Sequence, residues 1–321
     1  GPAAGGCRRW QYASDAEAVT DVLRLSRGMT YKNAEAGLPF GGGKSVILAD
    51  DDTPKPEALF RAFGQAVETL GGRYITAEDV GIAVDDMRIV REETRFVSGL
   101  PQSGESAGGD PSPWTALGCY LGLVAGVRHR LDKDGVAGLK IAVQGVGHVG
   151  LKLVEMLVEG GAEVIVADVN RENLRRAKAI EGVTVVPPLD ILFTDVDVLA
   201  PCALGNVLDA QTIPRIKASL VAGAANNQLS TPEDGQRLAD RGILYAPDYL
   251  INAGGVISVA HEYLGESSES AVRVEVERIP ERLREIFEES ARSNRPTDEI
   301  ADELARRIVA GADNNDSRQT A

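Results

Sequence analysis

Apolar and polar residues follow two different periods along the second half of the chain. Short apolar runs such as Lys140–Gln144 and Glu163–Val169 alternate with stretches such as Gly150–Glu159, in which apolar residues recur three and four positions apart. Short apolar runs between turn residues are typical of buried strands, and the longer spacing is typical of helices. Strands separated by helices predict a parallel sheet that is covered on both faces. The other elements predicted by this pattern are a helix at Arg171–Ile180 and strands at Val183–Val186, Val196–Ala200, Leu220–Gly223 and Gly242–Ala246.

Residues 1–110 have a less regular pattern, in which Gly-rich turns interrupt short elements. Asp15–Ser26 and Lys55–Leu70 have helical spacing, whereas Lys44–Ala49 and Gly72–Thr76 are typical of strands. This half is therefore predicted to be mixed α/β.

The stretch between the two patterns, residues 104–113 (GESAGGDPSP), is rich in turn-forming residues and predicts a linker. A chain of 321 residues is long enough for about two domains. We therefore expect a mixed α/β domain at residues 1–110 and a parallel-sheet α/β domain at residues 111–289.

Charge and cysteine content exclude several classes of protein. The 48 acidic residues outnumber the 34 basic ones, which gives a net charge of −14 that disfavours a nucleic-acid partner. No apolar run is long enough to cross a membrane. Cys7, Cys119 and Cys202 lie far apart without a C-x-x-C pair, which argues against a disulfide framework and against a zinc site. We therefore expect no bound metal, no membrane partner and a cytoplasmic location.

A dinucleotide-binding fingerprint follows the first strand of the second half. Gly145, Gly147 and Gly150 form G-x-G-x-x-G between that strand and a helix. In this motif the glycines allow a tight turn, close approach of a pyrophosphate and close packing of helix on strand. Asp168 ends the next strand, where a carboxylate binds ribose hydroxyls and repels a 2′-phosphate. NAD is thus favoured over NADP, although the neighbouring Arg171 weakens that preference.

A second Gly-rich segment, Tyr31–Lys44 (YKNAEAGLPFGGGK), carries two lysines. It lacks the order G-x-x-x-x-G-K-[ST] and leads into a strand, which disfavours a phosphate-binding loop. One ammonium could bind a substrate carboxylate, and the other, desolvated beside a like charge, could act as a general base. Asp79 follows a predicted strand and could exchange a proton with a substrate amine. From these residues alone, surface lysines and a helix-capping Asp79 remain an alternative.

Together these segments resemble the leucine, valine and phenylalanine branch of the amino-acid dehydrogenase superfamily that includes glutamate dehydrogenase. The resemblance covers most of the chain, in order. The matching stretches are Gly1–Arg8, Tyr12–Lys44, Thr76–Met87, Pro111–Gly118, Val143–Gly147, Ala200–Gly205, Gly223–Leu229 and Ala246–Ile257.

The resemblance implies NAD-dependent oxidative deamination of an L-amino acid to a 2-oxo acid and ammonium, and the reverse reaction. It implies that Lys32 binds the substrate carboxylate, that Lys44 activates water and that Asp79 exchanges protons with the amine. Other residues implied near the substrate or cofactor are Gly5 and Gly6 at the substrate, Thr115 and Asn226 at the nicotinamide, and Cys202 and Asn252 in motifs near the cofactor.

The resemblance also implies a pocket for the substrate side chain at Ala4, Ala77, Val256 and Val259. Ala77 and Val256 favour an aliphatic substrate such as leucine or valine. Ala4 enlarges the pocket, so phenylalanine or tryptophan is the alternative. Discrimination by one or two methylenes amounts to only about 1–3 kcal/mol, so overlapping substrates are expected.

Family architecture implies a Rossmann-type NAD domain and a substrate domain with a cleft between them. It implies that helices from about residue 290 to residue 321 return to the first domain, and that the protein is a homo-oligomer. A non-catalytic NAD-binding protein on the same fold is the alternative from another class. The presence of Lys32, Lys44 and Asp79 together argues against that alternative.

Overall fold

The computed structural model of the chain describes residues 1–49, 54–100, 110–203, 205–265 and 268–316. These residues form two compact units. Unit 1 contains Gly1–Pro111, Val256–Val272 and Ala305–Ala321, and unit 2 contains Ser112–Gly255 and Arg273–Leu304. Most of the predicted linker, residues 104–113, lies outside the described residues, and a helix already begins at Ser112.

Unit 2 is built on a six-stranded sheet in which every strand pairs in parallel. Its strands are β6 (Lys140–Gln144), β7 (Glu163–Ala167), β8 (Val183–Val185), β9 (Val198–Pro201), β10 (Leu220–Val221) and β11 (Leu244–Tyr245). Its helices are α4 (Ser112–Leu131), α5 (His148–Glu159), α6 (Arg171–Lys178), α7 (Glu233–Asp240), α8 (Asp248–Ile251), α11 (Ile279–Ser293) and the start of α12 (Thr297–Asp316).

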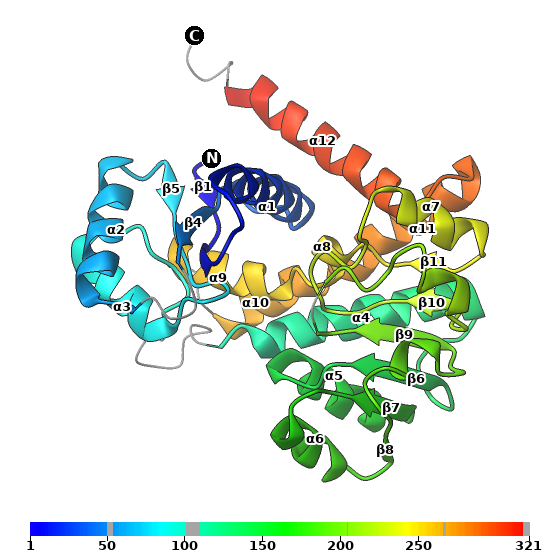
Figure 1. Cartoon of the computed structure of the whole chain (residues 1–321). Helices are drawn as coiled ribbons and strands as arrows, with labels where there is room; N and C mark the ends of the chain where they lie inside the picture. The colour runs from blue at the N-terminus through cyan, green and yellow to red at the C-terminus, as the bar shows by residue number, and fades with distance from the viewer. Residues whose placement is uncertain (50–53, 101–109, 204, 266–267, 317–321) are drawn as a thin grey trace. The chain divides into compact units, whose positions relative to one another are not determined.

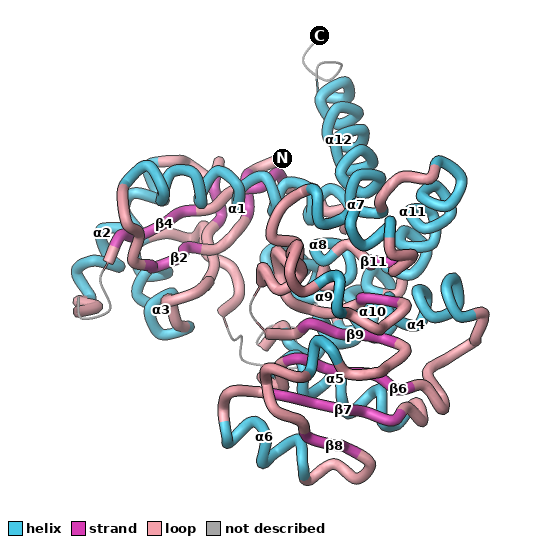
Figure 2. The backbone as a smooth tube through the Cα atoms, turned by 45° about the vertical axis from the view of Figure 1, so that its right-hand side comes forward, coloured by secondary structure: helices cyan, strands magenta, loops and turns pink. Residues whose placement is uncertain are grey.

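The strand order of this sheet is β11-β10-β9-β6-β7-β8, so that β7 and β8 lie on one side of β6 and the later strands on the other (Figure 1). This order reverses between β6 and β9, which is the topological switch point of a dinucleotide-binding fold. Figure 2 shows β6, β7, β8 and β9 side by side. The predicted parallel α/β half is confirmed; β6 has the predicted bounds, and the other five strands are shorter than the apolar runs that predicted them.

Helix α4 packs against α5 and α11 in unit 2 and was not predicted from the sequence. Gly118, Gly122 and Gly126 lie four positions apart on one face. A Cβ atom at Gly122 would lie 2.6 Å from Ile251 Cγ1 and 2.7 Å from Leu283 Cδ1, so these glycines let α8 and α11 pack against the helix backbone. Because its other faces are also largely apolar, the helix has no clear amphipathic period.

Unit 1 is mixed α/β, as predicted. Its strands form a parallel sheet of order β3-β1-β5 and a parallel pair β2-β4. The strands are β1 (Ala3–Ala4), β2 (Cys7–Trp10), β3 (Gly41–Gly42), β4 (Ser45–Leu48) and β5 (Tyr74–Ile75). The helices are α1 (Asp15–Glu35), α2 (Glu57–Thr69), α3 (Val84–Glu93), and parts of α9 (Gly254–Leu264), α10 (Glu269–Val276) and α12.

A small apolar core holds unit 1 together, with Phe60 of α2 and Val90 of α3 both fully buried. Cys7 of β2 belongs to the same core. A Cβ atom at Gly64 would lie 2.8 Å from Glu93 Cβ, so α2 and α3 pack closely where this side chain is absent. Strand β2 thus turns one of its two faces toward the core.

Helix α1 is longer than predicted, since it continues past Ser26 to Glu35 and places Lys32 in its last turn. The Gly-rich segment therefore begins as helix and becomes a turn only at Gly37, which has a φ of +68°.

The C-terminal unit boundaries also differ from those expected. Residues 256–272 belong to unit 1, and the helices as far as Leu304 belong to unit 2. The reason is that α11 buries Ile279, Leu283 and Phe287 within unit 2, with Ile279 and Leu283 against the glycine face of α4.

Candidate active site

Lys44 and Asp79 form an ion pair in unit 1, in which Lys44 Nζ donates to Asp79 Oδ2. Lys44 lies between β3 and β4, and Asp79 lies four residues after β5. The two side chains are only 11% and 17% exposed, so the charges meet largely away from water. Burial alone would raise the pKa of Asp79, but the charge and hydrogen bond of Lys44 outweigh it and lower that pKa. The result is a stable carboxylate held against an ammonium.

Glycines make this pairing possible because they let backbone segments approach one another. A Cβ atom at Gly6 would lie 2.3 Å from Glu78 O and 3.0 Å from Asp79 Cβ. A Cβ atom at Gly42 would lie 2.0 Å from Thr30 N on α1. Any side chain at these positions would push away the segments that carry Asp79 and Lys44. The two Gly-rich turns therefore have a steric role at the candidate site.

Lys32 enters this region from α1, which packs against β3 and β4. Its side chain is half-buried. The two lysines of the Gly-rich segment thus come from adjacent elements. This arrangement suits a site in which Lys32 binds a substrate carboxylate beside the pair of Lys44 and Asp79. The role of Lys32 in substrate binding stays a prediction.

Three polar residues linked to Asp79, namely Arg8, Asp21 and Tyr12, were not predicted from the sequence. Arg8 Nε lies 3.7 Å from Asp79 Oδ2, and Arg8 Nη1 donates to Asp21 Oδ2 at 3.0 Å. Tyr12 Oη donates to the same Asp21 oxygen at 2.6 Å. A sequence signal for Arg8 did exist, because Gly6 and Arg8 are two positions apart in an extended segment and so share a face.

A buried polar network supports the turn at Gly5. Tyr74 Oη donates to Gly5 O at 2.7 Å and lies 3.0 Å from Ser45 Oγ. Burial raises the pKa of Tyr74 to about 12 and that of the Cys7 thiol to about 11. Both groups are therefore neutral at physiological pH and act as structural supports.

The residues predicted to line a side-chain pocket all belong to unit 1. Ala4 lies in β1 beside Ile75, and Ala77 follows two residues after Ile75. Val256 and Val259 lie in α9. All four side chains are half-buried. Their shared role in substrate selection stays a prediction.

The Gly145 loop of unit 2 has the geometry that a dinucleotide needs. Gly145 has a φ of +94°, and a Cβ atom at Gly150 would lie 2.0 Å from Gly145 O. A Cβ atom at Gly147, in contrast, would meet no atom within 4 Å, so space is open above the loop at the start of α5. A strained turn, tight helix packing and open space fit the three roles that the motif predicts for a bound pyrophosphate.

Asp168 is fixed beside this loop by donors from three residues. Its Oδ2 accepts from Val146 N at 2.8 Å and from Asn173 Nδ2 at 3.2 Å, and its Oδ1 accepts from Asn170 N at 2.7 Å. The side chain is only half-buried. An oriented carboxyl group at the end of β7 suits ribose hydroxyls and disfavours a phosphate.

The other predicted cofactor residues gather at the carboxyl ends of the unit 2 strands. Asn252 Nδ2 donates to Asn226 Oδ1 at 2.8 Å and to Ala224 O at 3.1 Å, while Asn252 Oδ1 is buried without a hydrogen-bond partner. A Cβ atom at Gly254 would lie 3.1 Å from Thr115 N, so this segment also adjoins the start of α4.

Cys202 lies after β9, where its Sγ accepts a 3.5 Å hydrogen bond from Ala224 N. Burial raises the pKa of this thiol to about 12, so it is a packing group in its protonated form.

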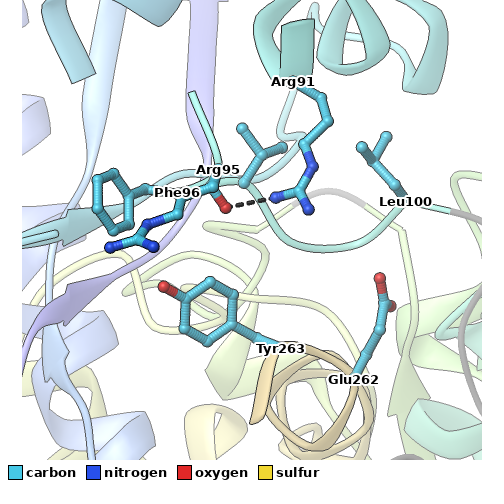
Figure 3. Close-up of a pocket in the computed structure, with 7 residues that line it drawn as sticks. Arg91, Arg95, Phe96, Leu100, Glu262 and Tyr263 are labelled. Carbon is cyan, nitrogen blue, oxygen red and sulfur yellow. Dashed lines mark hydrogen bonds between the residues drawn. The ribbon is translucent and has the colours of Figure 1, made fainter. Parts of the chain in front are cut away.

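A separate pocket of about 740 Å³ lies within unit 1 (Figure 3). Arg91 and Leu100 lie on one side of it, and Glu262 and Tyr263 lie on the other. Its charged groups already have partners within the chain: Arg91 Nη1 donates to Arg95 O, and Glu262 accepts from the backbone of Gly99 and Leu100. None of the predicted site residues lines it.

Two negative findings concern the described residues alone. They contain no cluster of three or more His, Cys, Asp or Glu side chains arranged to hold a metal ion. None of the described helices is both long enough and apolar enough to span a membrane.

Comparisons with known proteins agree with this architecture. Residues 1–96 match the family model described as "Glu/Leu/Phe/Val dehydrogenase, dimerisation domain", and residues 166–312 match "Glutamate/Leucine/Phenylalanine/Valine dehydrogenase". The chain is 50% identical to the leucine dehydrogenase of Thermoactinomyces intermedius over 306 residues, which are 95% of this chain and 83% of that protein.

Enzymes named for aromatic substrates are similar as well. Identity to the phenylalanine dehydrogenase of Bacillus thermotolerans is 44%, covering 96% of this chain and 82% of that one. The crystal structure of L-tryptophan dehydrogenase from Nostoc punctiforme superposes with a TM-score of 0.85 at 42% identity, covering 98% of this chain and 90% of that chain. The chain is thus an amino-acid dehydrogenase that belongs to the Glu/Leu/Phe/Val dehydrogenase family, in its leucine, valine and phenylalanine branch.

Proposed function

We propose that the enzyme catalyses the NAD-dependent oxidative deamination of an aliphatic L-amino acid to its 2-oxo acid and ammonium, and the reverse reductive amination. The observation that carries this proposal is the ion pair of Lys44 and Asp79, held away from water by Gly-rich turns. The Asp79 carboxylate can accept a proton from the substrate amine, and Lys44, once its ammonium has lost a proton, can act as the general base for hydrolysis; amine oxidation followed by hydrolysis requires both.

Each residue of the site has one task in this reaction. Lys32 binds the substrate carboxylate as a point charge. Asp79 takes a proton from the substrate ammonium, so that the free amine can release its Cα hydride. The nicotinamide ring, when bound, accepts that hydride. Lys44, after its own proton has passed to solvent, then deprotonates a water molecule that attacks the imino carbon, and Asp79 returns a proton to the departing amine. Positioning these groups supplies much of the rate acceleration.

NAD is proposed over NADP because of Asp168. Its carboxylate is oriented by Val146 N and Asn170 N at the end of β7. A phosphate on the ribose would meet that negative charge at close range. Gly145, Gly147 and Gly150 would hold the pyrophosphate, and Thr115, Cys202, Asn226 and Asn252 would lie toward the nicotinamide end.

The substrate is proposed to be leucine or valine. Ala77 and Val256 give an apolar pocket lining, and the most similar of the relatives compared above is named a leucine dehydrogenase. Phenylalanine or tryptophan is the second candidate, favoured by the small Ala4 side chain and by the relatives named for these substrates. A ratio of kcat/KM for leucine over phenylalanine below one would reverse this assignment.

We further propose that the protein is a homo-oligomer, because residues 1–96 match a model described as a dimerisation domain. Light scattering during size-exclusion chromatography tests this. A single species at 34.0 kDa would contradict it.

The decisive test of function is NADH formation with a panel of L-amino acids at alkaline pH, with NADP as the alternative oxidant. We expect activity with leucine and valine that Lys44→Ala reduces by about three orders of magnitude while NADH binding is retained. Lys55→Ala is the matched control, since Lys55 pairs with Asp86 on the surface of the same unit. Absence of turnover with every amino acid, or full turnover in Lys44→Ala, contradicts the proposal.

A further inference from the structure

Arg8 lies between two carboxylates, those of Asp21 and Asp79. On one side its Nη1 donates to Asp21, and on the other its Nε faces Asp79 Oδ2 at 3.7 Å. The Arg8 side chain is 22% exposed, which makes it part of the site interior. A guanidinium holds both contacts at fixed angles because its donors lie in one rigid plane.

The Nε atom of Arg8 is buried and donates to no acceptor. At 3.7 Å from Asp79 Oδ2, it is beyond hydrogen-bond length but within ion-pair range. Asp79 Oδ2 is meanwhile engaged by Lys44 Nζ. Arg8 Nε therefore lacks a hydrogen bond to Asp79 while Lys44 occupies the acceptor oxygen. Leaving a buried donor without an acceptor costs free energy, which suggests that this hydrogen bond forms at another stage of the reaction.

Asp21 and Tyr12 prevent Arg8 from moving away. Asp21 lies on α1 and accepts from both Arg8 Nη1 and Tyr12 Oη through one oxygen. Because these contacts hold Arg8 in place, the hydrogen bond between Arg8 and Asp79 can form only if the Asp79 carboxylate moves a short distance.

Catalysis supplies the reason for such a movement. In the proposed reaction Lys44 must release Asp79 in order to work on water, and Asp79 must be an oriented carboxylate when it takes a proton from the substrate ammonium, before that water attacks. We propose that Arg8 is a positioning residue for Asp79: anchored by Asp21 and Tyr12, it receives the carboxylate when Lys44 leaves it. This inference rests on the function proposed above.

Arg8 and Lys44 are the positive charges that lower the pKa of Asp79. Both cations lower the pKa of Asp79 against the opposing effect of burial. The Cys7 thiol and the Tyr74 phenol also adjoin it, and their pKa values of about 11 and about 12 keep them neutral between pH 4 and pH 9. Other titratable groups in this region are Glu78, beside Asp79 in the chain, Lys32 on α1, and Asp21 and Tyr12, which contact Arg8.

The test replaces Arg8 in the full-length enzyme and follows the pH dependence of kcat with leucine. Arg8→Gln removes the charge, so the acidic limb should move upward by about one pH unit, and kcat at neutral pH should fall about tenfold. Arg8→Lys keeps the charge but not the fixed pair of contacts, so it should restore the acidic limb and leave kcat low. Tyr12→Phe should shift the limb less than Arg8→Gln does.

Arg88→Gln is the matched control, because it removes one positive charge from an exposed surface pair in the same unit. Its pH profile should coincide with that of the wild type. A profile for Arg8→Gln that also coincides, with unchanged kcat, overturns the proposal. A defect shared equally by Arg8→Gln and Arg8→Lys, with no change of pH profile, would show a structural role instead.

A second measurement separates this inference from the proposed function. Carbon-13 NMR of the Asp79 carboxyl, assigned by its loss in Asp79→Asn, gives the titration midpoint without turnover. The midpoint should rise in Arg8→Gln, and an unmoved midpoint contradicts the Arg8 role even if the enzyme is active. Conversely, a raised midpoint in a protein that oxidises no amino acid would leave the Arg8–Asp79 coupling intact and reject the function.

Discussion

The two candidate binding regions of this enzyme are built in opposite ways. In unit 2 the Gly145 loop and Asp168 come from two consecutive strands and the turns that follow them, so one local motif defines the site. In unit 1 the pair of Lys44 and Asp79 is assembled from segments 35 residues apart, brought together by glycines elsewhere in the chain. A phosphate-binding loop depends on local backbone conformation, which a short sequence motif can encode. A buried ion pair depends on packing between segments that are far apart in the sequence.

The largest effect should follow from neutralising the assembled site. Asp79→Asn keeps the shape of the side chain but removes its proton-accepting charge, so kcat should fall by about 10²- to 10⁴-fold. Steady-state kinetics with leucine and NAD measures this. Glu78→Gln, at the neighbouring position, should retain most of the activity, and equal losses in the two variants would argue against a specific role for Asp79.

The local motif should respond to a side chain according to the position of each glycine. In Gly150→Ala the new Cβ would lie 2.0 Å from Gly145 O, so the free energy of unfolding should fall by about 3 kcal/mol. Urea unfolding in the absence of cofactor measures this. An unchanged midpoint would show that α5 can shift without cost.

A comparison of pH effects should show opposite signs in the two units. In unit 2, burial and then the neighbouring Asp302 and Glu299 raise the pKa of Asp298 to about 6. Because the folded state binds this proton more tightly than the unfolded state, stability should fall as pH rises from about 4 to about 6, by about 2 kcal/mol for this half-buried group. Asp298→Asn should remove that slope, and a slope that persists would assign it to other groups.

Asp79 in unit 1 has the reverse behaviour. Burial raises its pKa, but Lys44 lowers it further, so the net shift is downward. Its contribution to stability should be complete above about pH 4 and lost as pH falls through the lowered value. Comparing the acid unfolding of Asp79→Asn with that of the wild type measures this, and identical acid limbs would contradict the ion pair.

The smallest effects should come from positions that face open space around the dinucleotide loop. Gly147→Ala should leave stability within about 0.5 kcal/mol, because its Cβ would meet no atom within 4 Å, yet weaken NADH binding about tenfold. Asp168→Asn should raise the ratio of kcat/KM for NADP over NAD about tenfold, since it removes one repulsive charge. Titration of NADH fluorescence and paired kinetics measure these changes. Unchanged binding in the first variant, or an unchanged ratio in the second, would place the cofactor elsewhere.

The difference between the two regions also explains what could be predicted from the sequence. The parallel sheet and the Gly145 loop were predictable because strand and helix periods and the glycine spacing are local. Helix α4 was missed because its apolar residues surround it and its glycines resemble a turn. The end of α1 was missed for a similar reason, since Lys32 lies where the pattern becomes Gly-rich.

In unit 1 the residue types of the site were predictable from family resemblance, but their supports were not. The alternation of an extended segment places Arg8 on the same side as Gly6, but only the fold brings Arg8, Tyr12 and Asp21 together near Asp79. Their contacts depend on distance between elements, which no single-sequence period encodes.

Strand β2 places Cys7 in the apolar core and the next residue, Arg8, beside the catalytic pair. A single residue inserted between Gly6 and Cys7 would exchange these environments, because it would move the guanidinium to the core face and the thiol to the opposite face. Folding and chemistry are therefore sensitive to the same error of register. A change of length in this segment would therefore disturb the core and the catalytic pair together, whereas a substitution would act at one position.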